Sequence, residues 1–256
     1  MNKTIKRHQR VHLPIRNLLR TFVTVMLSAG LSGLAQTVST PSAAAGPAMA
    51  KRVFVMGDSM GELVSYALKK ELTKYAGTSF DSFISLGSGL ARNDLFDWPA
   101  KLRSTMTTFQ PNVIIIIIGM TDDQKMKAGG NLLAFGTPEW TTEYGRRVRE
   151  IMDICRAGGT KTMLWVGLPD VRDPQTNRDM KIITGILEEQ AASRPGSQYM
   201  DITSLFSTTP GQYSPYILKK DGMPLIVRSS DGKHYSPAGA DLLSQAIITK
   251  LEKELH

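Results

Sequence analysis

The chain has 256 residues, with 31 lysines and arginines against 23 aspartates and glutamates, and a single cysteine, Cys155. One cysteine excludes an intrachain disulfide. Six of the basic residues lie before residue 51, where there is no acid, so the remainder has 25 bases against 23 acids, a net charge of +2. This balance, without a basic stripe, excludes the electrostatic pattern of a nucleic-acid-binding protein.

The first 50 residues have the composition of an export signal. A basic stretch up to Arg20 precedes the apolar run TFVTVMLSAGLSGLA, and small residues follow, ending in Ala-Met-Ala at 48–50. These are the three regions of a secretory signal, and the apolar run is shorter than the roughly 20 residues that span a bilayer. We expect residues 1–50 to be a signal peptide and low-complexity tether, and residues 51–256 to form one domain.

Export without disulfides suits the bacterial periplasm or the cell exterior. The alternative is a leader that is retained as a membrane anchor, which would be the chain's one contact with a membrane.

From residue 51 onward, patterns typical of strands and helices alternate. The expected strands are 52–56, 80–86, 113–118, 162–168 and 198–202, and the expected helices are 59–74, 94–109, 141–156, 177–193 and 236–251. The third strand is six consecutive β-branched residues, which is typical of a strand covered on both faces. The alternation predicts an α/β fold, a three-layer α/β/α sandwich with a central parallel sheet of about five strands.

One segment breaks the alternation. Residues 211–232 contain two extended runs around Asp221-Gly222, which predicts a small β-hairpin insertion. Because the hairpin precedes the last helix, we expect it to form a flap beside a site there.

Ser59 follows the first strand in GDSMG, residues 57–61. Ligands bind at the carboxyl ends of parallel strands, and the helix N-terminus there could stabilise an oxyanion. Two alternatives exist at this stage. Ser59 could simply cap the helix, or Gly57-x-Ser59-x-Gly61 could be the nucleophile elbow of an α/β-hydrolase.

The histidines narrow the choice of a base. His8 and His12 lie in the leader and His256 is the last residue, which leaves His234. Asp231 stands three residues before it, where a carboxylate can hold Nδ1 of the imidazole. The alternative is an Asp-Gly turn followed by a surface histidine.

Taken together, Gly-Asp-Ser after the first strand and Asp-x-x-His before the last helix resemble the SGNH/GDSL hydrolase superfamily. The resemblance spans roughly residues 53–251 and is most similar to a poorly characterised periplasmic branch, with SGLARNDLFDWP at 88–99 and DGKHYSPAGA at 231–240. It implies a flavodoxin-like sheet, with Ser59 as nucleophile, His234 as base and Asp231 as orienting acid. It also disfavours the elbow, whose serine follows a later strand and whose acid is distant from the histidine.

The resemblance further implies an oxyanion hole made by the N–H groups of Ser59 and Gly89, with Gly87 as the alternative register. The family's Gly-x-Asn-Asp block falls on residues 119–122, where Thr121 replaces the asparagine. A threonine offers one hydroxyl on a shorter arm, so this departure predicts a weaker oxyanion hole.

Further side chains are candidates for substrate contact: Asp58, Asp122, Trp98 and Arg228. The alternatives are that Trp98 packs at a helix start and that Arg228 is a solvated hairpin arginine. We expect no metal site at the adjacent Asp122 and Asp123, because neighbouring loop residues seldom converge on one ion, and no cofactor. Cys155 lies in a helical pattern without a partner histidine, and we expect it in the core.

The function expected from these features is an exported serine esterase that acts on acyl esters, O-acetyl groups of envelope carbohydrate among them, through an acyl-enzyme. The alternatives are an O-acyltransferase of envelope polysaccharide and a catalytically weak domain that binds polysaccharide or protein.

Overall fold

The structure is a computed structural model that describes residues 50–207, 209 and 211–256. The predicted signal peptide and the alternative membrane anchor therefore lie, apart from residue 50, outside the described residues. Within the described ranges, no helix is long and apolar enough to cross a membrane.

Five parallel strands form the central sheet: β1 (Lys51–Gly57), β2 (Thr78–Ile84), β3 (Val113–Ile117), β6 (Thr162–Val166) and β7 (Ser197–Met200). Their order is β2-β1-β3-β6-β7, which is the flavodoxin-like order. Every residue of β3 is buried, as its unbroken β-branched run predicts. The predicted α/β fold with a parallel sheet of about five strands is confirmed.

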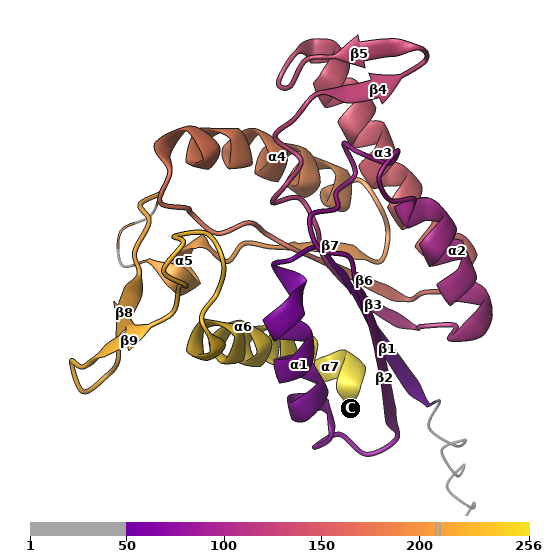
Figure 1. Ribbon diagram of the computed structural model, residues 1–256. Helices are drawn as coiled ribbons and strands as arrows, with labels where there is room; N and C mark the ends of the chain where they lie inside the picture. Colours follow the sequence, from indigo (N-terminus) through magenta and orange to yellow (C-terminus); the bar gives the residue numbers. More distant parts are fainter. Residues whose placement is uncertain (1–49, 208, 210) are drawn as a thin grey trace, which may run out of the picture. The chain divides into compact units, whose positions relative to one another are not determined.

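Helices cover both faces of the sheet (Figure 1). On one face α1 (Gly61–Leu72) packs against α6 (Pro237–Lys250). On the other face lie α2 (Trp98–Thr108), α3 (Pro138–Ala157) and α4 (Pro174–Ala192), in which α3 contacts both neighbours. The short helices α5 (Thr203–Phe206) and α7 (Glu252–Leu255) both contact α6.

Four of the long helices begin with the same chemistry. The side chain of the N-cap residue accepts a hydrogen bond from a backbone N–H of the first turn, and a proline follows within two positions. The cap residues are Asp97, Thr137, Asp173 and Ser236. Two of these caps start α3 and α4 three residues earlier than the apolar spacing predicts.

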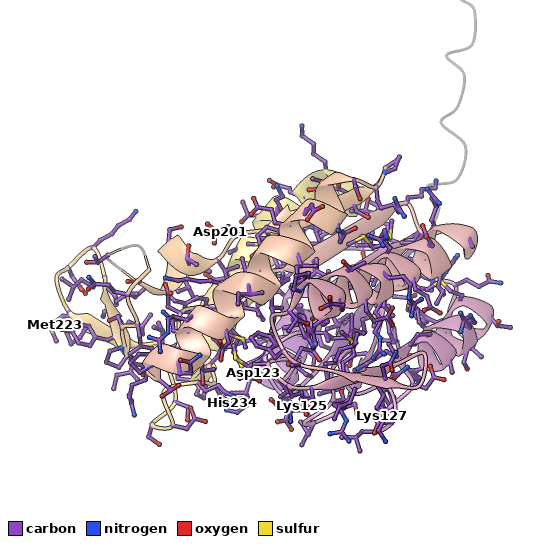
Figure 2. All side chains as sticks on the ribbon, turned by 90° about the horizontal axis from the view of Figure 1, so that it is seen from above. Asp123, Lys125, Lys127, Asp201, Met223 and His234 are labelled. Carbon is purple, nitrogen blue, oxygen red and sulfur yellow. The ribbon has the colours of Figure 1, made fainter. Side chains whose placement is uncertain are left out.

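Two small antiparallel hairpins extend from the layers. One is β8 (Tyr216–Leu218) with β9 (Pro224–Ile226), as predicted around Asp221-Gly222. The other, β4 (Met126–Ala128) with β5 (Asn131–Leu133), was not predicted, because three-residue strands give too little alternation to recognise. Figure 2 shows Met223, at the turn of β8–β9, well away from His234.

The core is continuous across the sheet and includes Trp140, Trp165 and the isoleucines of β3. Cys155 is buried in it, as predicted, and burial raises the pKa of its thiol to about 12.

The last helix is seated by a close backbone contact. A Cβ added to Gly239, in the first turn of α6, would lie 2.0 Å from the carbonyl oxygen of Val227. This glycine lets α6 approach the segment that leads into the Asp231–His234 turn.

We expect Gly239→Ala to lower the free energy of unfolding by about 1–3 kcal/mol, because the added methyl overlaps backbone that cannot move aside. Gly185→Ala is the matched control, since its Cβ would meet nothing within 4 Å in the middle of α4. The control is expected to be neutral or to stabilise by up to about 1 kcal/mol. Urea unfolding of both variants measures the difference, and equal effects would contradict the contact.

Candidate functional site

The turn between β1 and α1 presents Ser59 at the carboxyl edge of the sheet. The N-cap of α1 is Met60, which makes no side-chain cap bond, so Ser59 does not cap the helix. Its Oγ instead lies 2.9 Å from Nε2 of His234, and Nδ1 of His234 lies 2.6 Å from Oδ2 of Asp231. The structure thus brings together the three side chains that were predicted to act together, across 175 residues of sequence.

Asp231 is fixed by its own turn. Its Oδ1 accepts hydrogen bonds from the N–H groups of Lys233 and His234, at 2.8 and 3.0 Å. Partial burial would raise the pKa of Asp231, but the hydrogen bonds from the His234 ring and these two N–H groups outweigh it and lower the pKa to about 2. A carboxylate that is charged at neutral pH holds the imidazole proton on Nδ1, which leaves Nε2 free to accept the Ser59 hydroxyl proton.

Arg228 supports this turn from behind. Its side chain is only 2% exposed, and its guanidinium lies 5.4–5.8 Å from the ring centroids of Phe206, Tyr213 and Tyr235. Nη2 donates to the carbonyl of Lys233, next to His234. The expectation that Arg228 is a substrate contact or a solvated arginine is wrong, because the side chain is enclosed and holds the backbone of the turn.

Asp58 is also enclosed. It is fully buried and accepts hydrogen bonds from the N–H groups of Met60, Gly119 and Met120, at 2.8, 3.1 and 3.1 Å. Burial raises its pKa to about 6, against the opposing effect of these bonds. A substrate cannot reach this carboxylate, so its predicted substrate contact is wrong; its bonds join the loop after β1 to the loop after β3.

Asp122 makes a second connection of the same kind. It is fully buried and accepts from the N–H groups of Leu90 and Ala91, at 3.1 and 2.7 Å, and from the Tyr144 hydroxyl at 2.7 Å. Burial raises its pKa, although the Ala91 N–H and the Tyr144 hydroxyl oppose the shift. Its predicted substrate contact is wrong for the same reason as that of Asp58; it joins the loop after β3 to the loop after β2.

This second connection explains the glycine at position 89. A Cβ on Gly89 would lie 2.1 Å from Oδ1 of Asp122, so any larger residue would push the carboxylate away from the backbone that it holds. The need for glycine here comes from close approach rather than from backbone conformation.

Arg147 holds the other side of the same loop and was missed by the sequence analysis. From α3 its Nη1 donates to the carbonyls of Leu90 and Ala91, at 2.7 and 3.1 Å, and its Nε pairs with Glu143 at 2.8 Å. The side chain is nearly buried. The available signal was an arginine three residues after Tyr144, within the apolar stripe of that helix.

Trp98 and Thr121 both bind Ser88. Trp98 is 1% exposed and its Nε1 donates to the Ser88 hydroxyl at 3.1 Å. It packs at the start of α2, as one of the two predicted alternatives had it, and the other alternative, a substrate contact, is wrong. The Thr121 hydroxyl donates to the Ser88 carbonyl at 2.6 Å. It is therefore already used in the folded chain and, in this arrangement, is not aimed at an oxyanion.

The two backbone N–H groups predicted for the oxyanion hole, unlike the Thr121 hydroxyl, are not already engaged in a hydrogen bond within the part of the chain that the structure describes. Among the described residues, neither the N–H of Ser59 nor that of Gly89 has a hydrogen-bond partner. Neither N–H would have to break a hydrogen bond to bind an oxyanion, and of the two residues Ser59 is the one that lines the pocket next to His234.

The hydrogen-bonded residues Ser59, His234 and Asp231, called the relay below, open into a pocket of about 480 Å³. The lining residues are Ser59, Met60, Glu62, Leu63, Leu86, Ser229, Asp231, His234 and Tyr235. Ser229 and Asp231 of the predicted segment 211–232 belong to this lining, whereas the strands β8 and β9 do not. The segment therefore borders the site through the chain that returns from the hairpin, and not through the hairpin itself.

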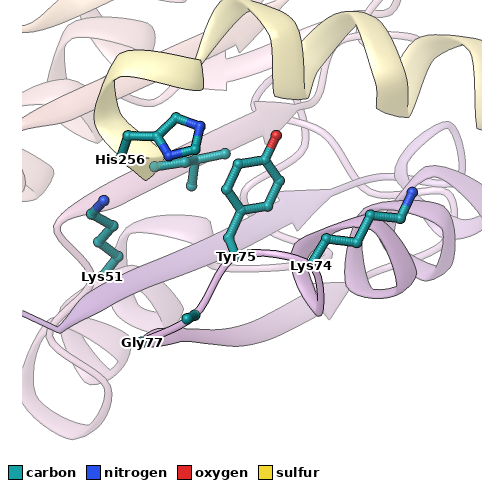
Figure 3. Close-up of a pocket in the computed structure, with 7 residues that line it drawn as sticks. Lys51, Lys74, Tyr75, Gly77 and His256 are labelled. Atoms are coloured by element: carbon teal, nitrogen blue, oxygen red, sulfur yellow. The ribbon is translucent and has the colours of Figure 1, made fainter.

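A second hollow of the same volume lies at the amino end of β1 (Figure 3). There Lys51, Lys74, Tyr75 and Gly77 surround His256, whose ring packs against Tyr75 with 5.4 Å between the centroids. Because β1 runs from Lys51 to Gly57, this hollow is at the opposite end of the strand from Ser59, and it takes no part in the relay.

Within the part of the chain that the structure describes, no group of three or more histidine, cysteine, aspartate or glutamate side chains is arranged to hold a metal ion.

We expect Asp122→Ala to lower the free energy of unfolding by more than about 3 kcal/mol, because it leaves three buried donors unpaired at about 1–3 kcal/mol each. The matched control is Asp123→Ala, which changes the adjacent, partly exposed carboxylate and is expected to stay within about 0.5 kcal/mol of the parent. Chemical unfolding of the two variants makes the comparison, and a mild effect of Asp122→Ala would show that the loops do not depend on it.

Two solved structures illustrate what the chain is similar to. A lipase, Lip_vut3, from a goat rumen metagenome has 12% sequence identity and a TM-score of 0.53, over 80% of this chain and 100% of the lipase. The catalytic domain of the peptidoglycan O-acetyltransferase OatA from Streptococcus pneumoniae has 16% identity and a TM-score of 0.47, over 80% of this chain and 95% of that one. At these identities the likeness concerns the fold alone. No curated protein matches the chain.

The family described as "Protein of unknown function (DUF459)" matches residues 52–250, which include both ends of the relay and all five strands of the sheet except the first residue of β1. The chain belongs to this family.

Proposed function

We propose that the protein is a serine esterase that works through an acyl-enzyme. The observation that carries the proposal is the hydrogen-bonded series from Ser59 through His234 to Asp231. The alternatives, Ser59 as a helix cap and His234 as a surface histidine, do not account for hydrogen bonds that join the two side chains to each other and to Asp231. Here a hydroxyl, an imidazole and a charged carboxylate meet at the mouth of a pocket, at the sheet edge where the strand order reverses.

In the first step Ser59 Oγ attacks the ester carbonyl while Nε2 of His234 takes its proton. The imidazolium that forms is stabilised by the Asp231 carboxylate. The carbonyl oxygen becomes negatively charged and is stabilised by the N–H groups of Ser59 and Gly89. When the C–O bond breaks, His234 returns its proton to the leaving alcohol.

In the second step water attacks the acyl group on Ser59, and His234 accepts and returns a proton in the same way. The products are a carboxylic acid and the free enzyme. A sugar hydroxyl in place of water would give acyl transfer with the same three residues, so the acceptor decides between the two reactions.

The leader composition supports a periplasmic or secreted location, and esters of the cell envelope are then the accessible substrates. O-acetylated carbohydrate is one such class, and fold-level analogy is its only support.

The central test uses Ser59→Ala with a fluorophosphonate probe and aryl esters. We expect the parent to be labelled covalently and to hydrolyse the esters, and Ser59→Ala to lose both. Ser104→Ala, an exposed serine of α2, is the control and should keep both. Adding sugar acceptors and analysing products separates transfer from hydrolysis. No labelling and no turnover in the parent would favour a polysaccharide- or protein-binding domain.

A second test concerns Thr121. Because its hydroxyl is bound to the Ser88 carbonyl, we expect Thr121→Val to cost about 1 kcal/mol of stability and to lower kcat less than tenfold. An oxyanion donor would instead cost about 10²–10³ in kcat. Steady-state kinetics and thermal unfolding are measured together: a loss of that size at unchanged stability would show that the hydroxyl turns toward the substrate during catalysis.

A further inference from the structure

Two leucines border the nucleophile in the pocket. Leu63 lies four residues after Ser59, in the first turn of α1, and Leu86 follows the end of β2. Both line the pocket that contains Ser59 and His234. They are nevertheless exposed, Leu63 by 38% and Leu86 by 63%, although each offers a large aliphatic surface.

The rest of the lining does not suit an anionic substrate group. Of the nine lining residues that the structure describes, none is a lysine or arginine, and the one charged residue outside the relay is Glu62. The nearby cation, Arg228, is enclosed by aromatic rings. An anionic substrate group would therefore meet Glu62 and Asp231 without a compensating positive charge.

Aromatic surface for stacking on a sugar ring is also lacking in this lining. Its aromatic residue, Tyr235, is 3% exposed and packs against Phe206. The exposed apolar surface of this lining is that of Leu63 and Leu86.

We propose that Leu63 and Leu86 form a subsite for an aliphatic chain attached to the ester, so that the preferred substrates carry a chain longer than acetyl. This inference rests on the proposed esterase function and specifies its substrate class. The chain can belong to the acyl group or to the alcohol, because the pocket touches both Ser59 and His234. Each methylene that leaves water adds up to about fourfold to kcat/KM.

The experiment measures two ester series with the full chain. One series lengthens the acyl group of p-nitrophenyl esters from acetate to octanoate, and the other lengthens the alcohol of acetate esters from ethyl to octyl. We expect kcat/KM to rise at least about tenfold from the shortest to the six-carbon member in one series, which identifies the source of the chain.

Leu86→Ser is expected to reduce that rise, taken as the ratio of kcat/KM between the six-carbon and the shortest ester, to less than about threefold. Leu86→Met should retain the preference, because it keeps a flexible apolar side chain. The matched control is Leu132→Ser, in β5, whose leucine is 60% exposed but does not line the pocket. It should leave the preference unchanged, and thermal unfolding verifies that all variants fold.

The results separate the subsite from the catalytic function. Equal rates along both series, or a chain preference that survives Leu86→Ser, would overturn the subsite while leaving the esterase in place. If the parent protein shows no Ser59-dependent turnover, the proposed esterase function is rejected. The subsite is then tested separately, by saturation-transfer NMR of p-nitrophenyl hexanoate in the presence of the Ser59→Ala protein. Contact that Leu86→Ser abolishes supports the subsite; absence of contact overturns it.

Discussion

The arrangement of the site depends on two buried carboxylates that bind backbone N–H groups across loops. Asp58, after β1, holds the loop after β3, and Asp122, after β3, holds the loop after β2. Three loops that are distant in sequence are thereby fixed at one edge of the sheet. Hydrogen bonds to charged groups are stronger than those between neutral groups, which suits loops that have no secondary structure of their own.

These carboxylates carry a cost that depends on pH. Burial raises the pKa of Asp58 from its ordinary value of 3.8 to about 6, and the nearby charge of Asp122 adds to the shift. A carboxyl whose pKa is higher in the folded than in the unfolded state makes folding less favourable as the pH rises through that interval. At neutral pH the fold therefore tolerates a destabilising charge at the position directly before Ser59, in exchange for a fixed loop geometry.

The exposed and the buried side chains of the site have different roles. Side chains that face the pocket carry the chemistry that we propose, whereas Asp58, Asp122, Arg147 and Arg228 lie behind it and hold backbone. Thr121 belongs with the second group, because its hydroxyl secures the Ser88 carbonyl next to Gly89. In the mechanism that we propose, Ser59 and Gly89 supply the oxyanion donors, and Thr121 holds the residue that precedes Gly89.

The sequence by itself determined the alternation of strands and helices that builds the sheet, and its resemblance to a known family predicted that Ser59 lies with Asp231 and His234. The unbroken β-branched run of β3, the Ser-Pro cap of α6 and the Asp-x-x-His spacing are local signals, which the folded chain retains. Only the tertiary structure decided the roles of Trp98, Asp58, Asp122 and Arg228, which the sequence offered as substrate contacts. A polar residue type shows only that a side chain can form hydrogen bonds. Whether that side chain meets solvent or the backbone of another loop depends on contacts between segments 30–60 residues apart, such as Asp122 with Ala91 and Asp58 with Gly119. No local sequence pattern encodes these contacts.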